Sequence, residues 1–404
     1  MDYQKFLDRQ FVMTDAGRID RVRDLYTTFN PHVDLQAMID GGYMEALEEM
    51  MESILMNLDD HSPEVIAYWA KHGMVKEFHG ENTPFSWTEY AAKTGYEWKA
   101  NPVDAPQNNQ RRWNSFVPVS AFDPAIEDRK YPVIFMLHGG FNPISVIDGW
   151  GLPLEASKRE FIVIAPSIEL DDVLEDILEE AKALYPIDES RVYVCGFSYG
   201  GFMSNYLGNK RPDLFAAVCP CGAPISDGYC EKAFGPEPQP PFDGKARAEQ
   251  MGTYMPVMNI YGNLDGFRFP LYDAKAFNPR IMNRDELPSA TKTYVDGLNH
   301  WIRVNKGQAI DLNAVMALKG REDVSPEEKN MGLPLAPECR HTVVADGITN
   351  YIADFPSEDG IVRTRLMCEM NMPHWPTPEM ARQILDFCSH FSRDRKTGES
   401  IYHA

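Results

Sequence analysis

The sequence predicts an α/β fold with a mainly parallel, doubly wound sheet, preceded by a helical N-terminal extension. From Trp113 onward, short apolar runs alternate with amphipathic helical patterns, as expected for a parallel sheet with helices on both faces. The run Pro132–Leu137 is continuously apolar, which is typical of a central strand buried on both sides. A third run, Val192–Cys195, passes through a glycine-rich turn into a helical pattern. These observations predict one α/β domain over residues 111–404.

The elements of this domain are expected in a regular order. Strands are predicted at Trp113–Ser120, Pro132–Leu137, Glu160–Ala165, Val192–Cys195, Ala216–Cys219, Val257–Tyr261 and Ile361–Met370. Helices are predicted at Asp171–Tyr185, where the apolar residues share one face, and at Thr377–Phe391, where Pro378 begins the helix. The last strand and the last helix are therefore joined by a short loop.

Residues 1–110 differ from the rest of the chain. Between Leu35 and Leu58 the apolar residues recur at steps of three and four, which predicts an amphipathic helix. Asn101–Arg112 is rich in Pro and Asn and is expected to be a linker. We expect a mainly helical extension with one of three roles: a lid, an interface between copies of the chain, or an extension of the core.

Composition excludes some partners. The chain has 404 residues and a net charge of −21, whereas nucleic acids and anionic membranes require a basic surface. No apolar run approaches the about 18 residues that span a bilayer, and the N-terminus lacks the pattern of a secretory signal. Seven scattered cysteines are typical of reduced thiols in a cytoplasmic protein. Cys219-Pro220-Cys221 has no second pair to complete a metal site, so no metal is expected.

The glycine-rich turn carries the strongest functional signal. Gly196-Phe197-Ser198-Tyr199-Gly200 is a G-x-S-x-G motif between a strand and a helix, the context in which a serine is raised for nucleophilic attack. Side chains at either glycine would collide in so tight a turn. Ser198 is therefore the expected nucleophile. An ordinary glycine-rich turn is the alternative interpretation.

A serine nucleophile needs a base, an acid that orients the base, and donors for the oxyanion. In this fold the order along the chain is Ser, then Asp or Glu, then His. Asp265 follows the predicted strand Val257–Tyr261 and is the expected acid, because catalytic groups gather at the carboxyl ends of parallel strands. Asp273 and Asp296 are less well placed.

Two histidines compete for the role of base. His374 lies in the loop between the predicted last strand and last helix, where the fold is expected to carry its catalytic His. His300 lies in a helical pattern beside Trp301, which favours a packing role. His374 is preferred, His300 remains the alternative, and His341 and His390 are weaker candidates.

The oxyanion and the substrate require further groups. The N–H groups of Gly140 and Tyr199 are the expected oxyanion donors, with Phe141 as the neighbouring candidate, since glycine lets the backbone approach a carbonyl closely. Phe141 and Trp375 are expected to line the substrate pocket. His138 precedes the nucleophile in the chain and is expected to be structural.

From about Arg112 to Phe391 the chain resembles the α/β-hydrolases of the polyhydroxybutyrate depolymerase-like and feruloyl-type esterase family. The resemblance rests on ordered motifs: SFVPVSAFDP before KYPVIFMLHGG, then YPIDESRVYVCGFSYGGFM, RPDLFAAVCPCGAP, PVMNIYGNLD and MPHWP. The family usually has Gly before the last His, where this chain has Pro373. Many relatives are secreted and disulfide-bonded, whereas this chain is expected to be cytoplasmic with reduced thiols.

The resemblance implies a serine carboxylesterase that hydrolyses a small-molecule ester without cofactor or metal. It implies Ser198 as nucleophile, Asp265 as acid, His374 as base and the amides of Gly140 and Tyr199 as oxyanion hole. GFSYGGFM is also similar to the nucleophile motif of prolyl-oligopeptidase-type peptidases, so a peptidase is the alternative. A non-catalytic binding protein or an acyl-transferring enzyme on the same scaffold stays open.

Overall fold

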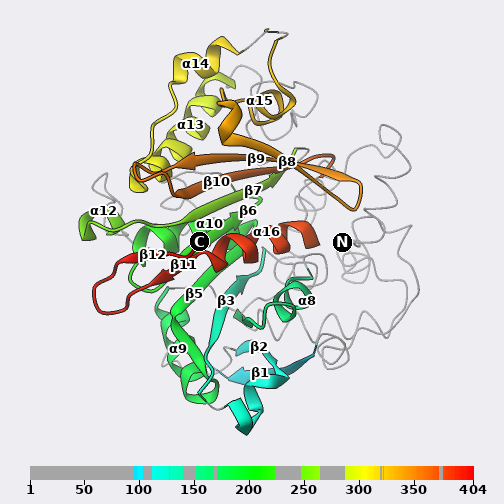
Figure 1. Cartoon of the computed structure of the whole chain (residues 1–404), viewed down its shortest axis with the longest axis vertical. Coiled ribbons are helices and arrows are strands. Elements are labelled where there is room, and N and C mark those ends of the chain that lie inside the picture. Colours follow the sequence, from blue (N-terminus) through cyan, green and yellow to red (C-terminus); the bar gives the residue numbers. More distant parts are fainter. Residues whose placement is uncertain are drawn as a thin grey trace, which may run out of the picture.

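The computed structural model describes residues 95–102, 112–126, 128–139, 151–166, 171–223, 247–263, 287–318, 321, 323–372 and 376–404. A ten-stranded sheet forms the centre of this part of the chain, in the order β1-β2-β4-β3-β5-β6-β7-β10-β9-β8 (Figure 1). Its strands are β1 (Tyr96–Pro102), β2 (Arg112–Pro118), β3 (Tyr131–Leu137), β4 (Ile162–Pro166), β5 (Ile187–Phe197), β6 (Ala217–Cys221), β7 (Val257–Gly262), β8 (Arg340–Ala345), β9 (Ile348–Pro356) and β10 (Val362–Glu369).

The middle of the sheet is parallel and its two edges are antiparallel. Strands β4, β3, β5, β6, β7 and β10 run in one direction. Strands β2 and β1 continue the sheet antiparallel at one edge, and β9 and β8 do so at the other. The mainly parallel sheet predicted from the sequence is confirmed.

Helices cover both faces of the sheet. On one face, α9 (Asp171–Leu184), α10 (Tyr199–Lys210) and α13 (Leu287–Val304) supply buried apolar side chains to a large core. On the other face, α8 (Leu152–Ser157) and α16 (Pro378–Ser389) supply a second core. The sheet is therefore doubly wound, as predicted.

Strand β3 shows why the central strands are continuously apolar. Val133, Phe135 and Leu137 belong to the first core, whereas Ile134 and Met136 belong to the second. Since successive side chains of a strand point to opposite faces, a strand between two cores needs apolar residues at every position.

The remaining elements are short. The 3-10 helices are η3 (Val119–Phe122), η4 (Pro124–Ile126) and η6 (Pro337–Cys339), and the short α-helices are α12 (Arg247–Met251), α14 (Leu312–Ala317) and α15 (Pro326–Met331). After α16, strands β11 (Phe391–Arg393) and β12 (Ser400–Tyr402) form a separate antiparallel pair. None of the described helices is at once long and apolar enough to cross a bilayer.

The sheet begins earlier than the sequence predicted. Strand β1 pairs with β2 in full antiparallel register and lies within the range expected to be a helical extension and linker. The amphipathic pattern between residues 35 and 58 lies outside the described residues.

A long excursion separates β7 from β10. It contains α13, α14 and α15, which lie together near the β9–β8 end of the sheet (Figure 1), and the β8–β9 hairpin. Ala345 pairs with Ile348, so Asp346 and Gly347 form a two-residue turn with φ of 51° and 80°. Asp-Gly is the residue pair that favours such a turn, and this signal could have revealed the hairpin from the sequence.

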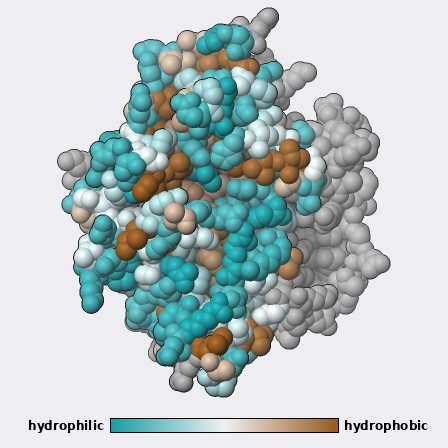
Figure 2. Space-filling model, viewed as in Figure 1, coloured by the Kyte–Doolittle hydropathy of each residue, from teal (hydrophilic) through white to brown (hydrophobic). Residues whose placement is uncertain are grey.

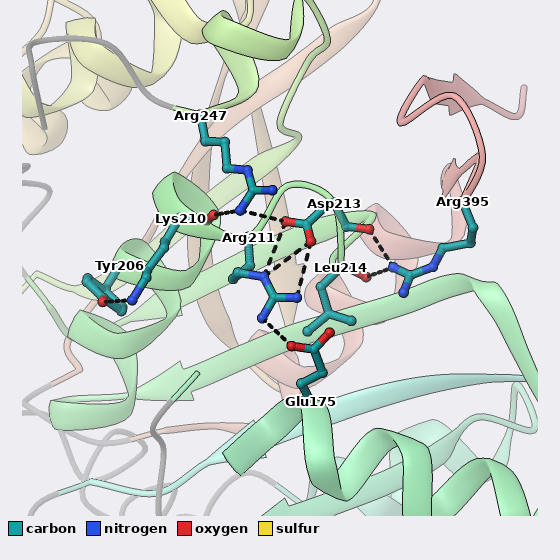
Figure 3. Close-up of polar contacts among 8 residues, drawn as sticks. All are labelled: Glu175, Tyr206, Lys210, Arg211, Asp213, Leu214, Arg247 and Arg395. Carbon is teal, nitrogen blue, oxygen red and sulfur yellow. Dashed lines mark hydrogen bonds and ion pairs between the residues drawn. The ribbon is translucent and has the colours of Figure 1, made fainter. Parts of the chain in front are cut away.

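The RPDLF motif that follows the nucleophile helix is a structural junction (Figure 3). Arg211 is largely buried and donates to Glu175 of α9 at 3.0 Å and to Asp213 at 3.1 Å. Arg395, from the turn between β11 and β12, donates to the backbone oxygens of Asp213 and Leu214. The junction therefore ties the end of α10 to α9 and to the C-terminal hairpin.

The surface in this view is mostly hydrophilic. Figure 2 shows teal over most of the described surface and brown in a few separate spots. Exposed large apolar side chains include Val119 and Leu154 on different elements, and single exposed apolar residues are normal for a globular protein.

We predict that Arg211→Met lowers the free energy of unfolding by about 2 kcal/mol, because two carboxylates lose hydrogen bonds from a largely buried cation. Urea unfolding measures the change. The matched control is Arg321→Met, whose partner Asp323 is 74% exposed in its side chain; it should cost less than about 0.5 kcal/mol. Equal costs for the two variants would contradict the structural role of the junction.

Candidate active site

Ser198 lies at the carboxyl end of β5, immediately before α10. Its backbone has φ 54° and ψ −113°, a conformation that a residue with a side chain rarely adopts and that costs about 1–3 kcal/mol. The residue is partly exposed and Tyr199 after it is exposed, while Phe197 before it and Gly200 are buried. The strained turn thus presents a serine at the C-terminal edge of the parallel sheet.

Close backbone packing explains both glycines of the motif. A Cβ at Gly196 would lie 2.1 Å from the backbone oxygen of Gly200, and a Cβ at Gly200 would lie 2.4 Å from the backbone oxygen of Leu137. Neither position accepts a side chain without a shift of the backbone. The turn is therefore pressed against the end of β3.

Backbone hydrogen bonds fix the turn to both neighbouring strands. The N–H of Ser198 donates to the oxygen of Cys221 at the end of β6, at 2.9 Å. The N–H of Gly200 donates to the oxygen of His138 after β3, at 3.0 Å. Tyr199 begins α10, so its amide lies where the helix dipole favours negative charge.

His138 supports the turn through its backbone. Its ring is buried, and Nδ1 lies 2.7 Å from the oxygen of Gly139. A Cβ at Gly139 would lie 3.4 Å from the Cβ of Ser198, so the segment that leads to Gly140 and Phe141 passes beside the serine. Gly140 and Phe141 themselves lie outside the described residues.

The carboxyl ends of β7 and β10 are tied together. The N–H of Asn263 donates to the backbone oxygen of Glu369 at 2.8 Å. A Cβ at Gly262 would lie 2.2 Å from the backbone oxygen of Met372, so only glycine allows this approach. Asp265, His374 and Trp375 lie just beyond these contacts in the sequence and outside the described residues.

The alternative base, His300, is far from the serine. Its Nε2 lies 2.5 Å from Oδ1 of Asn209 and its Nδ1 lies 3.0 Å from Nη2 of Arg303. Asn209 is near the last residue of α10, a helix of 12 residues and hence about 18 Å long, whereas Ser198 precedes its first residue. His300 therefore packs against the opposite end of the nucleophile helix and is not placed to act on Ser198.

The other weaker candidates lie on distant elements. His341 is on the edge strand β8, 3.8 Å from Asp354, and the ring of His390 stacks on Tyr402 after α16. Asp296 is in the middle of α13, away from the carboxyl ends of the strands, and Asp273 lies outside the described residues.

Glu369 is a buried carboxyl group that the sequence analysis missed. It is fully buried at the end of β10, and its Oε2 accepts a hydrogen bond from Oγ1 of Thr377 at 2.7 Å. Burial raises the pKa of Glu369 to about 8, and the nearby Glu379 carboxylate acts in the same direction. The one signal in the sequence is a single acidic residue in the otherwise apolar run Leu366–Met370.

Cys219 and Cys221 are buried thiols at the end of β6. The sulfur of Cys219 faces that of Cys388 on α16 at 3.7 Å, and burial raises the pKa of the Cys221 thiol well above its ordinary value. In the described part of the chain these residues pack in the second core.

Comparison with known families bears on the same region. The model of the prolyl oligopeptidase family (Peptidase_S9) matches residues 167–236, which include the nucleophile turn. NocK of Nocardia uniformis subsp. tsuyamanensis, provisionally named an esterase, is 29% identical over 124 residues, 30% of each chain. Poly(3-hydroxyalkanoate) depolymerase C of Paucimonas lemoignei is 26% identical over 111 residues, 22% of this chain and 27% of the depolymerase. The chain thus spans less than a third of the length of these relatives.

The solved structures that match have lower sequence identity to this chain. FphF, a fluorophosphonate-binding serine hydrolase of Staphylococcus aureus, is 13% identical, with 42% of this chain and 80% of that chain covered and a TM-score of 0.36. The feruloyl esterase module of Clostridium thermocellum is 15% identical, with 52% and 81% covered and a TM-score of 0.33.

The mainly parallel sheet with a strained serine turn after β5 is the arrangement of the α/β-hydrolase fold, and the sequence matches are to a peptidase family, an esterase and a depolymerase. They support the class predicted from the sequence, a serine hydrolase.

The packing of the turn predicts that one glycine substitution lowers stability and that another leaves it almost unchanged. Gly200→Ala forces a Cβ against the Leu137 backbone oxygen and should cost about 1–3 kcal/mol of stability. Gly139→Ala is the matched control, because its nearest contacts would be 3.4 Å, an ordinary van der Waals distance; it should change stability by less than about 0.5 kcal/mol. Urea unfolding of both variants distinguishes them, and an unchanged Gly200→Ala protein would contradict the described turn.

The raised pKa of Glu369 predicts that the free energy of unfolding depends on pH. The unfolded chain loses this proton near the ordinary value of 4.5 and the folded chain near 8, so unfolding releases a proton between these pH values. The contribution of Glu369 to the free energy of unfolding should therefore fall by up to about 1.4 kcal/mol per pH unit from pH 4.5 to 8 and level off above.

Urea unfolding of wild type and Glu369→Gln over this pH range tests the prediction. The Gln variant should lack this contribution to the slope, because it cannot ionise. The exposed Glu338→Gln variant is the control and should follow wild type. Identical slopes in wild type and Glu369→Gln would show that Glu369 ionises normally.

Proposed function

We propose that the protein is a serine carboxylesterase that forms an acyl-enzyme on Ser198. The observation that carries the proposal is the strained, partly exposed serine at φ 54° between β5 and α10. A residue holds such a conformation only where its surroundings enforce it, and such strain gathers at functional sites. The hydroxyl attacks an ester carbonyl, the alcohol leaves, and water then hydrolyses the acyl-enzyme.

His374 is proposed as the base and Asp265 as the acid that orients it. His374 removes the proton of Ser198, later protonates the leaving alcohol, and is held in the correct tautomer by Asp265. The contacts of Gly262 with Met372 and of Asn263 with Glu369 support this pairing, because they join the described ends of the two strands from which these residues follow.

The amides of Gly140 and Tyr199 are proposed to hold the oxyanion. The position of Tyr199 at the start of α10 and the passage of Gly139 beside Ser198 support this assignment. Each such donor contributes about 2.7–4 kcal/mol to stabilising the transition state. None of these steps requires a metal or an organic cofactor.

A small-molecule ester is the proposed substrate. NocK is named an esterase, which supports an ester as the substrate, and Phe141 and Trp375 are proposed to line the pocket for the acyl or alcohol group. A cytoplasmic setting is proposed from the odd number and the spacing of the seven cysteines in the sequence.

A serine peptidase of the prolyl-oligopeptidase type is the second candidate. The match to that family over residues 167–236 favours it, and the same nucleophile and base would cleave an amide. Hydrolysis of aminoacyl p-nitroanilides at rates comparable to those of p-nitrophenyl esters would support the peptidase, and hydrolysis of the esters alone would support the esterase.

The kinetics of variants test the proposed triad. With p-nitrophenyl butyrate, Ser198→Ala and His374→Ala should each lower kcat by at least about 10⁴-fold, because the two side chains act as one unit. Asp265→Asn should lower it by about 10⁴-fold, since the wrong tautomer of the base results.

Two substitutions away from the site serve as controls. Ser389→Ala, at the C-terminal end of α16, and His300→Gln, near the far end of α10, should retain wild-type kcat. Turnover that survives Ser198→Ala would disprove the proposed nucleophile. Loss of turnover in His300→Gln but not in His374→Ala would move the base to His300.

A further inference from the structure

Glu369 stands at the point where three elements of the site meet. In the sheet it is paired with Gly262 of β7 on one side and with Asn350 of β9 on the other. Its backbone oxygen binds Asn263, and its side chain binds Thr377, the residue that caps α16. One residue therefore connects the ends of β7 and β10 to the start of the last helix.

The bond to Thr377 closes the loop between β10 and α16. The hydroxyl of Thr377 donates to Oε2 of Glu369 at 2.7 Å and accepts from the N–H of Met380 at 3.2 Å. Both bonds are buried. They fix the separation between the last residue of β10 and the first turn of α16, and hence both ends of the connection in which His374 lies.

The second carboxyl oxygen indicates that Glu369 is uncharged. Oε1 of Glu369 and Oδ1 of Asn350 are both buried and have no hydrogen-bond partner in the described chain. The two residues are directly opposite in an antiparallel pair, so their side chains share one face of the sheet with Cβ atoms about 5 Å apart. A proton on Oε1 would let Glu369 donate to an acceptor on this face, and Oδ1 of Asn350 is a buried acceptor without a hydrogen bond there.

The charges around Glu369 act in the same direction. Glu379 of α16 is a second carboxylate near it and raises its pKa further, whereas the hydrogen bond from Thr377 lowers the pKa by less than burial raises it. The buried Cys221 thiol of β6 interacts electrostatically with Glu369, and burial keeps that thiol neutral. Arg382 is engaged by Glu379 and Glu155. A buried carboxylate without a paired cation is costly, so a neutral acid is the favoured form.

We propose that Glu369 is a positioning residue for the reaction: as a neutral acid it holds the start of α16 against the ends of β10 and β9, and thereby sets the alignment of the loop that supplies the base. The inference rests on the proposed function. Since a misplacement of about 1 Å can cost about 100-fold in rate, a group that fixes both ends of this loop controls kcat. Ionisation of Glu369 takes away the proton that Asn350 shares and adds a charge in a buried site, so activity falls at alkaline pH.

The experiment compares Glu369→Gln, Glu369→Leu and wild type with p-nitrophenyl butyrate between about pH 6 and pH 9.5. Gln keeps an acceptor for Thr377 and supplies a donor for Asn350 without titrating, so it should keep kcat within about 3-fold near neutral pH and lack the alkaline decline of wild type centred on the Glu369 pKa of about 8. Leu loses both bonds and should lower kcat by about 10- to 100-fold with little change in KM.

Two Thr377 variants keep the proposal testable if Glu369→Leu does not fold. Thr377→Ser retains the hydroxyl and should behave as wild type, whereas Thr377→Val should lower kcat as Glu369→Leu does. Thermal melting at each pH identifies variants that lose activity only by unfolding. An alkaline decline in Glu369→Gln equal to that of wild type, or unchanged kcat in both folded Leu and Val variants, would overturn the inference.

Two other outcomes would overturn the proposed function, and the inference with it. One is a wild-type protein that does not turn over the ester, and the other is full turnover after Ser198→Ala.

Discussion

The close approach of three backbone segments around Ser198 is the constraint on which the site depends. The oxygens of Leu137, Cys221 and Gly200 lie where side chains at Gly200, Gly201 and Gly196 would otherwise be. Because these contacts join β3, β5, β6 and α10, the unfavourable backbone conformation of Ser198 is maintained by the same packing that holds the sheet together. The same backbone contacts therefore stabilise the centre of the sheet and hold Ser198 in its partly exposed, strained position.

A second set of contacts extends this arrangement to β7 and β10. Asn263, Gly262 and Glu369 bring the ends of the two strands together, and Thr377 ties the last helix to the same point. The two helices of this face, α8 and α16, are also joined by charged groups: Arg382 of α16 lies 3.8 Å from the buried Glu155 of α8. Glu369 thus joins the ends of β7 and β10 to the start of α16, and the partly exposed Arg382 joins α16 to α8.

The sequence predicted the parts of the fold that have strong local signals. The apolar run of β3, the helix α9 and the G-x-S-x-G turn were found because burial on both faces, helical periodicity and steric crowding each leave a distinct pattern. Strand β1 was missed, since Tyr96–Pro102 carries charged and polar residues between its apolar ones and adjoins a segment with helical periodicity. The Asp346-Gly347 hairpin was overlooked although its turn residues are informative. Glu369 could not be recognised, because its burial and its partner Thr377 depend on tertiary contacts, and Asp265 and His374 remain predictions from their order in the chain.

Site-specific labelling with a fluorophosphonate probe tests the central claim most directly. The folded protein is treated with the probe, digested and analysed by mass spectrometry to locate the modified residue. The account predicts a single adduct on Ser198 that forms in the native protein and is absent after denaturation before treatment, because reactivity depends on the strained turn and its neighbours. No adduct on Ser198 in the folded protein, or equal labelling of several serines, would contradict it.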